Sequence, residues 1–341
     1  MKKAFTLAMA TILILSLFAG CGTTSGNKVA SAGTSKSKAS TDGKVYEIAV
    51  PLRIADMYAA WLKTSFETEA EKYDNIKVTV MDNQDDAAKW MELVENSITQ
   101  HYDYIIAQTP ICDAAGTIQK AKDAGIGYIT INLAQKATDG ICPTILCEEY
   151  KLGYLIGERA AKELPENAKV VILNGIAGIP PTTERRRGMQ DALLNVRTDV
   201  ELLDEQVADF DKSTAMDKTD DWLQAFPEID GVLASSDSMA LGAVESFKSN
   251  GRDIATTRFY GCDGLTDACQ AVMNGEMSAS ALQDATEFAR IALEMVQKDI
   301  RGEISLVNDN WDKYIAFDPI LIDSVNAEKQ FAFYREQGLV K

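Results

Sequence analysis

From residue 45 onward, short β-branched and aromatic runs alternate with segments whose apolar residues recur at helical spacing. Runs bounded by turn residues are typical of buried strands, and apolar spacings of three and four are typical of amphipathic helices. This alternation favours a parallel sheet covered by helices on both faces. The strands predicted first are residues 45–50, 76–81, 104–107, 128–131 and 145–147, and the helices between them are 57–73, 86–100 and 114–124.

The same alternation then begins again at residue 150. The further predicted strands are residues 170–173, 200–207, 231–234, 259–262 and 278–282, and the helices are 150–163, 184–195, 214–226, 238–249, 266–274 and 285–301. A body of roughly 300 residues is too long for one core and suits two lobes. We therefore expect an α/β fold with two doubly wound parallel-sheet lobes joined by a hinge.

The lobes are expected to exchange chain at three places. We predict an N-terminal lobe of residues 45–147 plus 284–313 and a C-terminal lobe of residues 148–283 plus 314–341. The crossings then lie near residues 147–148, 283–284 and 313–317.

The N-terminus has the layout of a bacterial secretory signal. Lys2 and Lys3 precede an apolar stretch at residues 7–17, and Cys21 follows it directly after a short small-residue segment. We predict a signal peptide at residues 1–20, lipid attachment at Cys21 and a flexible tether over residues 21–44. A plain secretion signal or a single membrane-spanning helix are the alternatives, although the apolar run is shorter than the ~20 residues that a span needs.

Composition excludes several functions. The formal net charge is -17, which repels nucleic acid, so no nucleic-acid partner is expected. His101 is the single histidine, and the cysteines other than Cys21 show no C-x-x-C spacing, so we expect neither histidine-based catalysis nor a metal site. One pair, such as Cys142 with Cys147, could form a disulfide, but free buried thiols are the expected state. No cofactor is expected.

Polar residues gather where the predicted strands end. In open parallel sheets, ligands bind outside the carboxyl ends of the strands, so two such sheets predict a cleft lined by these residues. The strand-end set consists of amides, carboxylates and hydroxyls, with one arginine at a helix start: Arg53, Asp56, Gln108, Asn132, Asn174, Arg185, Ser235, Ser236, Asp237, Asp263, Gln283 and Asp284. No nucleophile–base pair stands out among them.

Several short motifs resemble the pentose and hexose family of periplasmic sugar-binding proteins. Gly-Ile-Ala-Gly at 175–178 precedes Arg-Arg-Arg-Gly at 185–188, Ala-Asp-Phe-Asp stands at 208–211, and Gly-Cys-Asp-Gly stands at 261–264. The block at 234–243 (ASSDSMALGA) matches the family's A-x-N-D-x-M-A-L-G-A segment. The resemblance covers nearly all of residues 45–341 and implies a type I periplasmic binding protein fold.

The resemblance also implies a set of ligand-binding residues. Carboxylates and amides bind vicinal hydroxyls, an arginine binds two oxygens at once, and an aromatic ring covers the apolar face of a sugar. The implied ligand-binding residues are Asp56, Tyr58, Asn132, Arg185, Phe210, Ser236, Asp237, Asp263 and Gln283. Asp237 has a second interpretation, as the cap of a helix that begins at Ser238.

Two departures from the ribose-type pattern mean that the resemblance does not specify ribose as the ligand. Asn132-Leu133 stands where ribose binders carry Asp-Arg, and Ser236 stands where they carry Asn. Asn132 resembles the galactose branch and Gln283 the ribose branch, while the calcium loop of the galactose branch has no counterpart. The resemblance therefore implies a monosaccharide or polyol rather than ribose in particular.

The resulting hypothesis is a lipid-anchored, monomeric solute-binding protein that delivers its ligand to the permease of a carbohydrate ABC transporter. The alternative is a receptor that hands a sugar-like signal to a chemoreceptor or sensor kinase. A glycosidase would need two carboxylates across the cleft, and Asp56 and Asp263 are instead the residue types that a sugar pocket uses. We therefore expect binding without catalysis.

Overall fold

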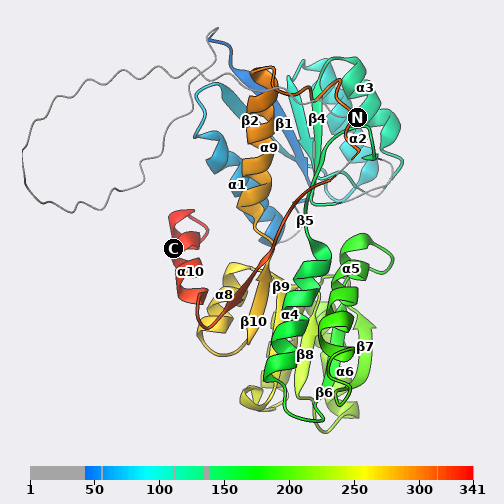
Figure 1. Cartoon of the computed structure of the whole chain (residues 1–341), viewed down its shortest axis with the longest axis vertical. Helices are drawn as coiled ribbons and strands as arrows, with labels where there is room; N and C mark the ends of the chain where they lie inside the picture. The colour runs from blue at the N-terminus through cyan, green and yellow to red at the C-terminus, as the bar shows by residue number, and fades with distance from the viewer. Residues whose placement is uncertain (1–42, 55–56, 111, 134–137, 313, 341) are drawn as a thin grey trace, which may run out of the picture. The chain divides into compact units, whose positions relative to one another are not determined.

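The computed structural model of the chain describes residues 43–54, 57–110, 112–133, 138–312 and 314–340. Within these ranges, the strands form two six-stranded sheets, and helices cover their faces (Figure 1). The predicted fold class, two doubly wound α/β units, is confirmed.

The first sheet is parallel throughout, in the order β11-β5-β4-β3-β1-β2. Its strands are β1 (Tyr46–Leu52), β2 (Ile76–Asp82), β3 (Tyr104–Ala107), β4 (Gly127–Ile131), β5 (Thr144–Cys147) and β11 (Ile315–Phe317). The helices between them are α1 (Met57–Ala70), α2 (Ala87–Thr99) and α3 (Ala115–Asp123). All four residues of β3 are buried, as expected for a strand covered on both faces.

The second sheet repeats this arrangement in the order β12-β10-β9-β8-β6-β7. Its strands are β6 (Lys169–Asn174), β7 (Glu201–Val207), β8 (Gly231–Ala234), β9 (Arg258–Asp263), β10 (Ala279–Leu282) and β12 (Ile320–Asp323). The helices that belong with it are α4 (Glu149–Glu163), α5 (Pro180–Met189), α6 (Lys212–Ala225), α7 (Asp237–Ser249), α8 (Thr266–Met273) and α10 (Ala327–Glu336). A π-helical turn, η2 (Gln190–Leu194), continues α5, and a 3₁₀ turn, η3 (Ile254–Thr256), precedes β9.

The chain passes between the sheets three times. It leaves the first sheet after β5 and returns after β10 through α9 (Ala285–Ile300), which packs against α1 (Figure 1). The third passage differs from the predicted boundary at 313/314. β11 pairs with β5 and β12 pairs with β10, so the chain crosses only after Phe317.

Other differences concern elements with weak sequence signals. β12 is antiparallel to β10, and neither it nor α10 is predicted by the apolar pattern. The helix predicted at 184–195 begins at Pro180, because a proline in the first turn has no hydrogen bond to lose and its fixed φ suits the helix.

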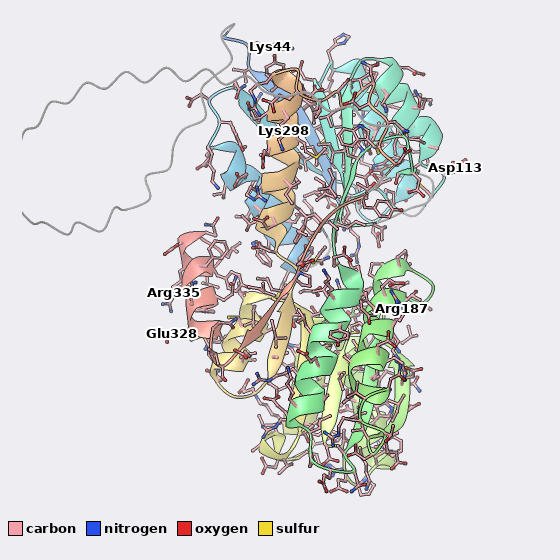
Figure 2. All side chains as sticks on the ribbon, in the orientation of Figure 1. Lys44, Asp113, Arg187, Lys298, Glu328 and Arg335 are labelled. Atoms are coloured by element: carbon pink, nitrogen blue, oxygen red, sulfur yellow. The ribbon has the colours of Figure 1, made fainter. Side chains whose placement is uncertain are left out.

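Both cores are built from the faces that the periodicity predicts. α9 buries Phe288 and Leu293, whereas its Lys298 side chain is two-fifths exposed (Figure 2). Among the described residues, no helix is long and apolar enough to cross a membrane.

Candidate ligand-binding site

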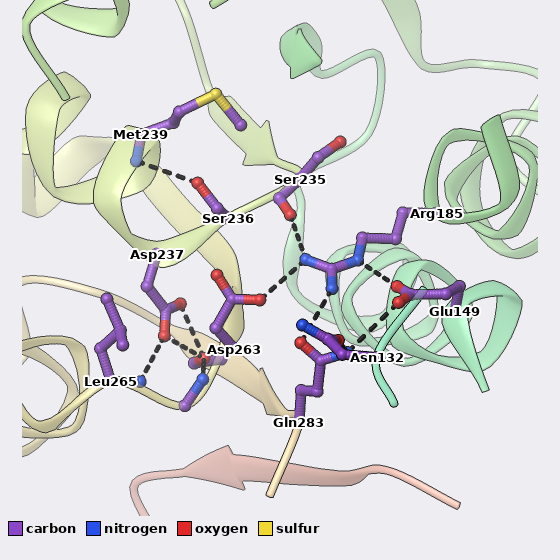
Figure 3. Close-up of polar contacts among 12 residues, drawn as sticks. Asn132, Glu149, Arg185, Ser235, Ser236, Asp237, Met239, Asp263, Leu265 and Gln283 are labelled. Carbon is purple, nitrogen blue, oxygen red and sulfur yellow. Dashed lines mark hydrogen bonds and ion pairs between the residues drawn. The ribbon is translucent and has the colours of Figure 1, made fainter. Parts of the chain in front are cut away.

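Polar side chains from both sheets meet at the carboxyl ends of their strands. Asn132 follows β4, Asp263 ends β9 and Gln283 follows β10, as the strand-end argument predicts. Gln283 Nε2 donates to Asn132 Oδ1 at 3.0 Å (Figure 3). This hydrogen bond links a residue that follows a strand of the first sheet to one that follows a strand of the second. Together with Arg185 of α5, these side chains form the candidate site.

Arg185 is the centre of this cluster, and its side chain is buried. Nε donates to Glu149 Oε2 at 2.6 Å, Nη1 donates to the Ser235 carbonyl at 2.7 Å and to Asp263 Oδ1 at 2.8 Å, and Nη2 donates to Gln283 Oε1 at 3.3 Å (Figure 3). Burial alone would lower the pKa of Arg185, but the carboxylates of Glu149 and Asp263 outweigh it and raise that pKa well above its ordinary value.

Its two sequence neighbours lie elsewhere. Arg186 pairs with Glu205, and Arg187 pairs with Glu184 on the surface of α5 (Figure 2). Of the three consecutive arginines, the structure therefore brings only Arg185 into the site.

Close packing of α4 on α5 places Arg185 beside Glu149. A Cβ built on Gly153 of α4 would lie 1.8 Å from the Arg185 carbonyl oxygen, and one on Gly188 of α5 would lie 2.2 Å from the Tyr150 carbonyl oxygen. Only glycine allows the two backbones to approach this closely. The Gly188 that follows the arginine run is thus a packing residue that sets the position of the guanidinium.

Glu149 belongs to the site although the sequence analysis does not select it. It is the first residue of α4, where the helix dipole favours a carboxylate, and its side chain is only 11% exposed. Besides Arg185, it accepts a hydrogen bond from Gln283 Nε2 at 3.2 Å. The sequence does not single it out, because acidic residues stand at both 148 and 149 and its role depends on the contact between α4 and α5.

Asp237 stabilises the loop that follows β9 and begins at Asp263. Asp237 is fully buried, and its carboxylate accepts hydrogen bonds from Leu265 N at 2.8 Å and from the Ser280 hydroxyl at 2.7 Å (Figure 3). Asp263 itself has φ 111°, a conformation that an L-residue adopts only when its surroundings impose it. Tyr334 of α10 adds a hydrogen bond to the Gly264 carbonyl.

The proposed capping role of Asp237 is wrong. Ser236 is the N-cap of α7, with its hydroxyl accepting from Met239 N at 3.4 Å, and Asp237 is the first helical residue. Burial, and then the nearby charge of Asp263, raise the pKa of Asp237 well above its ordinary value. Asp237 therefore supports the loop rather than presenting its carboxylate on a surface.

Phe210 lies next to the arginine. Its ring centroid is 6.0 Å from the Arg185 guanidinium carbon. The ring also covers Gly175, where an added Cβ would lie 2.0 Å from the ring. The Gly-Ile-Ala-Gly motif thus makes room for an aromatic ring at the site.

Tyr58 lies in the first turn of α1, and its hydroxyl is buried. Among the described residues, this hydroxyl has no hydrogen-bond partner. Burial and then the charge of Asp263 raise the Tyr58 pKa well above its ordinary value. Two further predicted residues, Asp56 and Cys21, lie outside the described residues.

The described parts of the chain contain no group of three or more His, Cys, Asp or Glu side chains suited to hold a metal ion. A separate hollow of about 430 Å³ lies at the amino ends of β1, β3 and β4, where Tyr46, His101 and Asp103 line it. That edge of the sheet is opposite to the one that carries the Arg185 cluster.

The known proteins that this chain resembles are periplasmic or solute-binding proteins. A family model described as a periplasmic binding protein domain matches residues 48–304. The ribose import binding protein RbsB of Salmonella typhimurium is 31% identical over 244 residues, which cover 71% of this chain and 80% of that protein.

Two solved structures are also similar. One is an ABC transporter solute-binding protein from Actinobacillus succinogenes with bound D-allose, with a TM-score of 0.74 and 26% identity over 84% of this chain and 100% of the other. The second is an ABC transporter solute-binding protein from Bacillus halodurans with bound myo-inositol, with a TM-score of 0.75 and 25% identity over 86% of this chain and 100% of the other.

Proposed function

This chain belongs to the periplasmic binding protein family, a family of binding proteins rather than enzymes, and on that premise we propose that it is the extracytoplasmic solute-binding protein of a carbohydrate ABC importer. Its ligand in this proposal is a monosaccharide or polyol. The relatives support this class, since one carries ribose in its name and two were solved with D-allose and myo-inositol.

The observation that carries the proposal is the Arg185 cluster. Arg185, Asp263, Gln283 and Asn132 bring a guanidinium, a carboxylate and two carboxamides together at strand ends of both sheets. Such groups supply donors and acceptors in fixed directions, as the vicinal hydroxyls of a sugar require. The ring of Phe210 supplies the apolar surface that the C–H face of a sugar needs.

Binding in this proposal uses residues that follow strands of both sheets. Tyr58 and Asn132 come from the first unit, and Arg185, Phe210 and Asp263 come from the second. A ligand that contacts residues of both units stabilises the conformation in which both groups of residues can bind it. Ligand binding therefore biases hinge motion at the three crossings. The permease then recognises the ligand-bound arrangement.

The proposal includes a lipid anchor on Cys21. Lys2, Lys3 and the apolar residues 7–17 precede this cysteine, and residues 22–44, rich in Ser, Thr, Gly and Lys, would serve as the tether in this proposal. Lipid attachment would hold the protein at the outer face of the cell membrane beside its permease. Mass spectrometry of the protein from membranes tests this part, because an unmodified residue 21 excludes it.

A thermal-shift panel tests the binding function. The purified protein is heated with pentoses, hexoses, inositols and, as a different solute class, amino acids. A specific ligand at a hundredfold excess over its dissociation constant adds about 2.7 kcal/mol to the free energy of unfolding. A shift with one sugar or polyol supports the proposal, and a shift with amino acids alone refutes it.

A further inference from the structure

Arg185 makes an unusually complete set of hydrogen bonds within the protein. A guanidinium has five N–H donors, and the bonds to Glu149, Ser235, Asp263 and Gln283 use four of them. One hydrogen on Nη2 has no partner among the residues that the structure describes. Arg185 can therefore give a ligand one hydrogen bond, which suffices for a hydroxyl oxygen.

An anionic ligand needs more than this. An arginine frequently binds a carboxylate or phosphate through two parallel N–H···O bonds from one edge of the guanidinium. The Nε edge already faces Glu149 at 2.6 Å, and Nη1 already faces Asp263 at 2.8 Å. To form the two-bond contact, a ligand anion would have to displace at least one present partner: Glu149, Asp263 or the Ser235 carbonyl.

The charge balance acts in the same direction. Glu149 and Asp263 place two carboxylates against one guanidinium, and the side chains of all three are 13% exposed or less. In such a poorly solvated place, like charges repel strongly, and a third anion would meet this repulsion without a free cationic edge. Of the two carboxylates, Glu149 is the one that occupies the Nε edge of Arg185 and also accepts a hydrogen bond from Gln283.

We propose that Glu149 is a specificity-determining residue that restricts the site to uncharged polyhydroxy ligands and excludes sugar acids and sugar phosphates. The inference rests on the proposed function and goes beyond it, because it assigns a role to a residue outside the predicted ligand set. Glu149 acts here through Arg185, as a positioning residue and as a fixed negative charge.

The test compares matched neutral and anionic ligands by isothermal titration at neutral pH. The pairs are D-galactose with D-galacturonate, D-ribose with D-ribose 5-phosphate, and myo-inositol with myo-inositol 1-phosphate. The proteins are the wild type, Glu149→Gln, Glu149→Asp and, as a control with the same change of charge on the same helix, Glu158→Gln. Glu158 pairs with Lys162 on the surface of α4.

The readout is the ratio of affinities within each pair. The wild type and Glu158→Gln should prefer the neutral member by about a hundredfold or more. Glu149→Gln keeps the shape and one acceptor but lacks the charge, so its ratio of neutral to anionic affinity should fall by about tenfold. Glu149→Asp keeps the charge, so it should retain the preference even if both affinities drop. A residue that only supported the fold would lower both affinities and leave the ratio unchanged.

Two outcomes overturn the inference while leaving the proposed function intact. One is a wild-type protein that binds an anionic member as tightly as its neutral partner. The other is a Glu149→Gln variant that binds neutral sugars and has the same ratio of neutral to anionic affinity as the wild type. Absence of binding to every carbohydrate by every protein instead refutes the proposed function, and the inference falls with it.

Discussion

Replacing Gly153 by alanine tests how the site is positioned. The new methyl group would lie 1.8 Å from the carbonyl oxygen of Arg185 and 2.6 Å from its carbonyl carbon. Both are backbone atoms, so no side-chain rotation relieves the clash. Because a Cβ essentially never lies closer than 3.0 Å to another heavy atom, relief of the 1.8 Å contact would require α4 and α5 to separate by more than an ångström.

The expected cost follows from two opposing effects. An alanine inside a helix is more favourable than glycine by about 1 kcal/mol, whereas forcing a methyl group into a packed backbone contact costs about 3 kcal/mol or more. The net loss is about 2 kcal/mol, which corresponds to a fall in melting temperature of about 4–8 °C. Separation of the helices would also pull Arg185 away from Glu149 and weaken ligand binding.

The assay is thermal unfolding without ligand, followed by titration with the sugar that the panel identifies. Gly116→Ala in α3 is the matched control, because a Cβ there meets nothing within 4 Å. The control should melt at or slightly above the wild-type temperature. If Gly153→Ala melts as the control does, the contact between the two helices does not set the position of Arg185.

Four further variants probe single residues of the site. Arg185→Ala and Asp263→Ala should each abolish the ligand-induced rise in melting temperature while unfolding remains cooperative, and unchanged binding in both would refute the pocket assignment. Tyr58→Phe removes a buried hydroxyl that lacks a described hydrogen-bond partner. The melting temperature without ligand should hold or rise, while ligand affinity measured by titration should fall by about three- to tenfold. Unaltered affinity would place the phenol outside the site. Burial and the charge of Asp263 raise the pKa of Asp237 in the native state, so the native protein holds a proton that the unfolded chain releases, and stability is lost as pH rises from about 4 toward the raised pKa. Asp237→Asn removes this titration, so its melting temperature should fall less than that of the wild type as the pH rises above about 4. Parallel pH profiles of the two proteins would contradict the raised pKa of Asp237.

The alternating strands and helices could be predicted because burial on both faces leaves a clear pattern. β3 and β8 are fully buried runs between turn residues, and both have the predicted bounds. β12 and α10 give weaker signals, because a short edge strand and a half-exposed helix contain few periodic apolar residues. Their positions depend on contacts with β10 and α8, which the local sequence does not encode.

The site divides in the same way. Asn132, Asp263 and Gln283 could be selected because a strand end is visible in the sequence. Glu149 could not, because its role arises where α4 meets α5, and Gly153 reveals that contact only once both helices are built. The direction in which Asp237 points was likewise fixed by the loop after β9, far along the chain.

The most direct test of the account is a crystal structure of the protein with the sugar or polyol that raises its melting temperature most. The account predicts the ligand beside Phe210, with its hydroxyls within hydrogen-bond distance of Arg185, Asp263 and Asn132. A ligand bound instead in the hollow beside His101 and Asp103, with the Arg185 cluster empty, would contradict it.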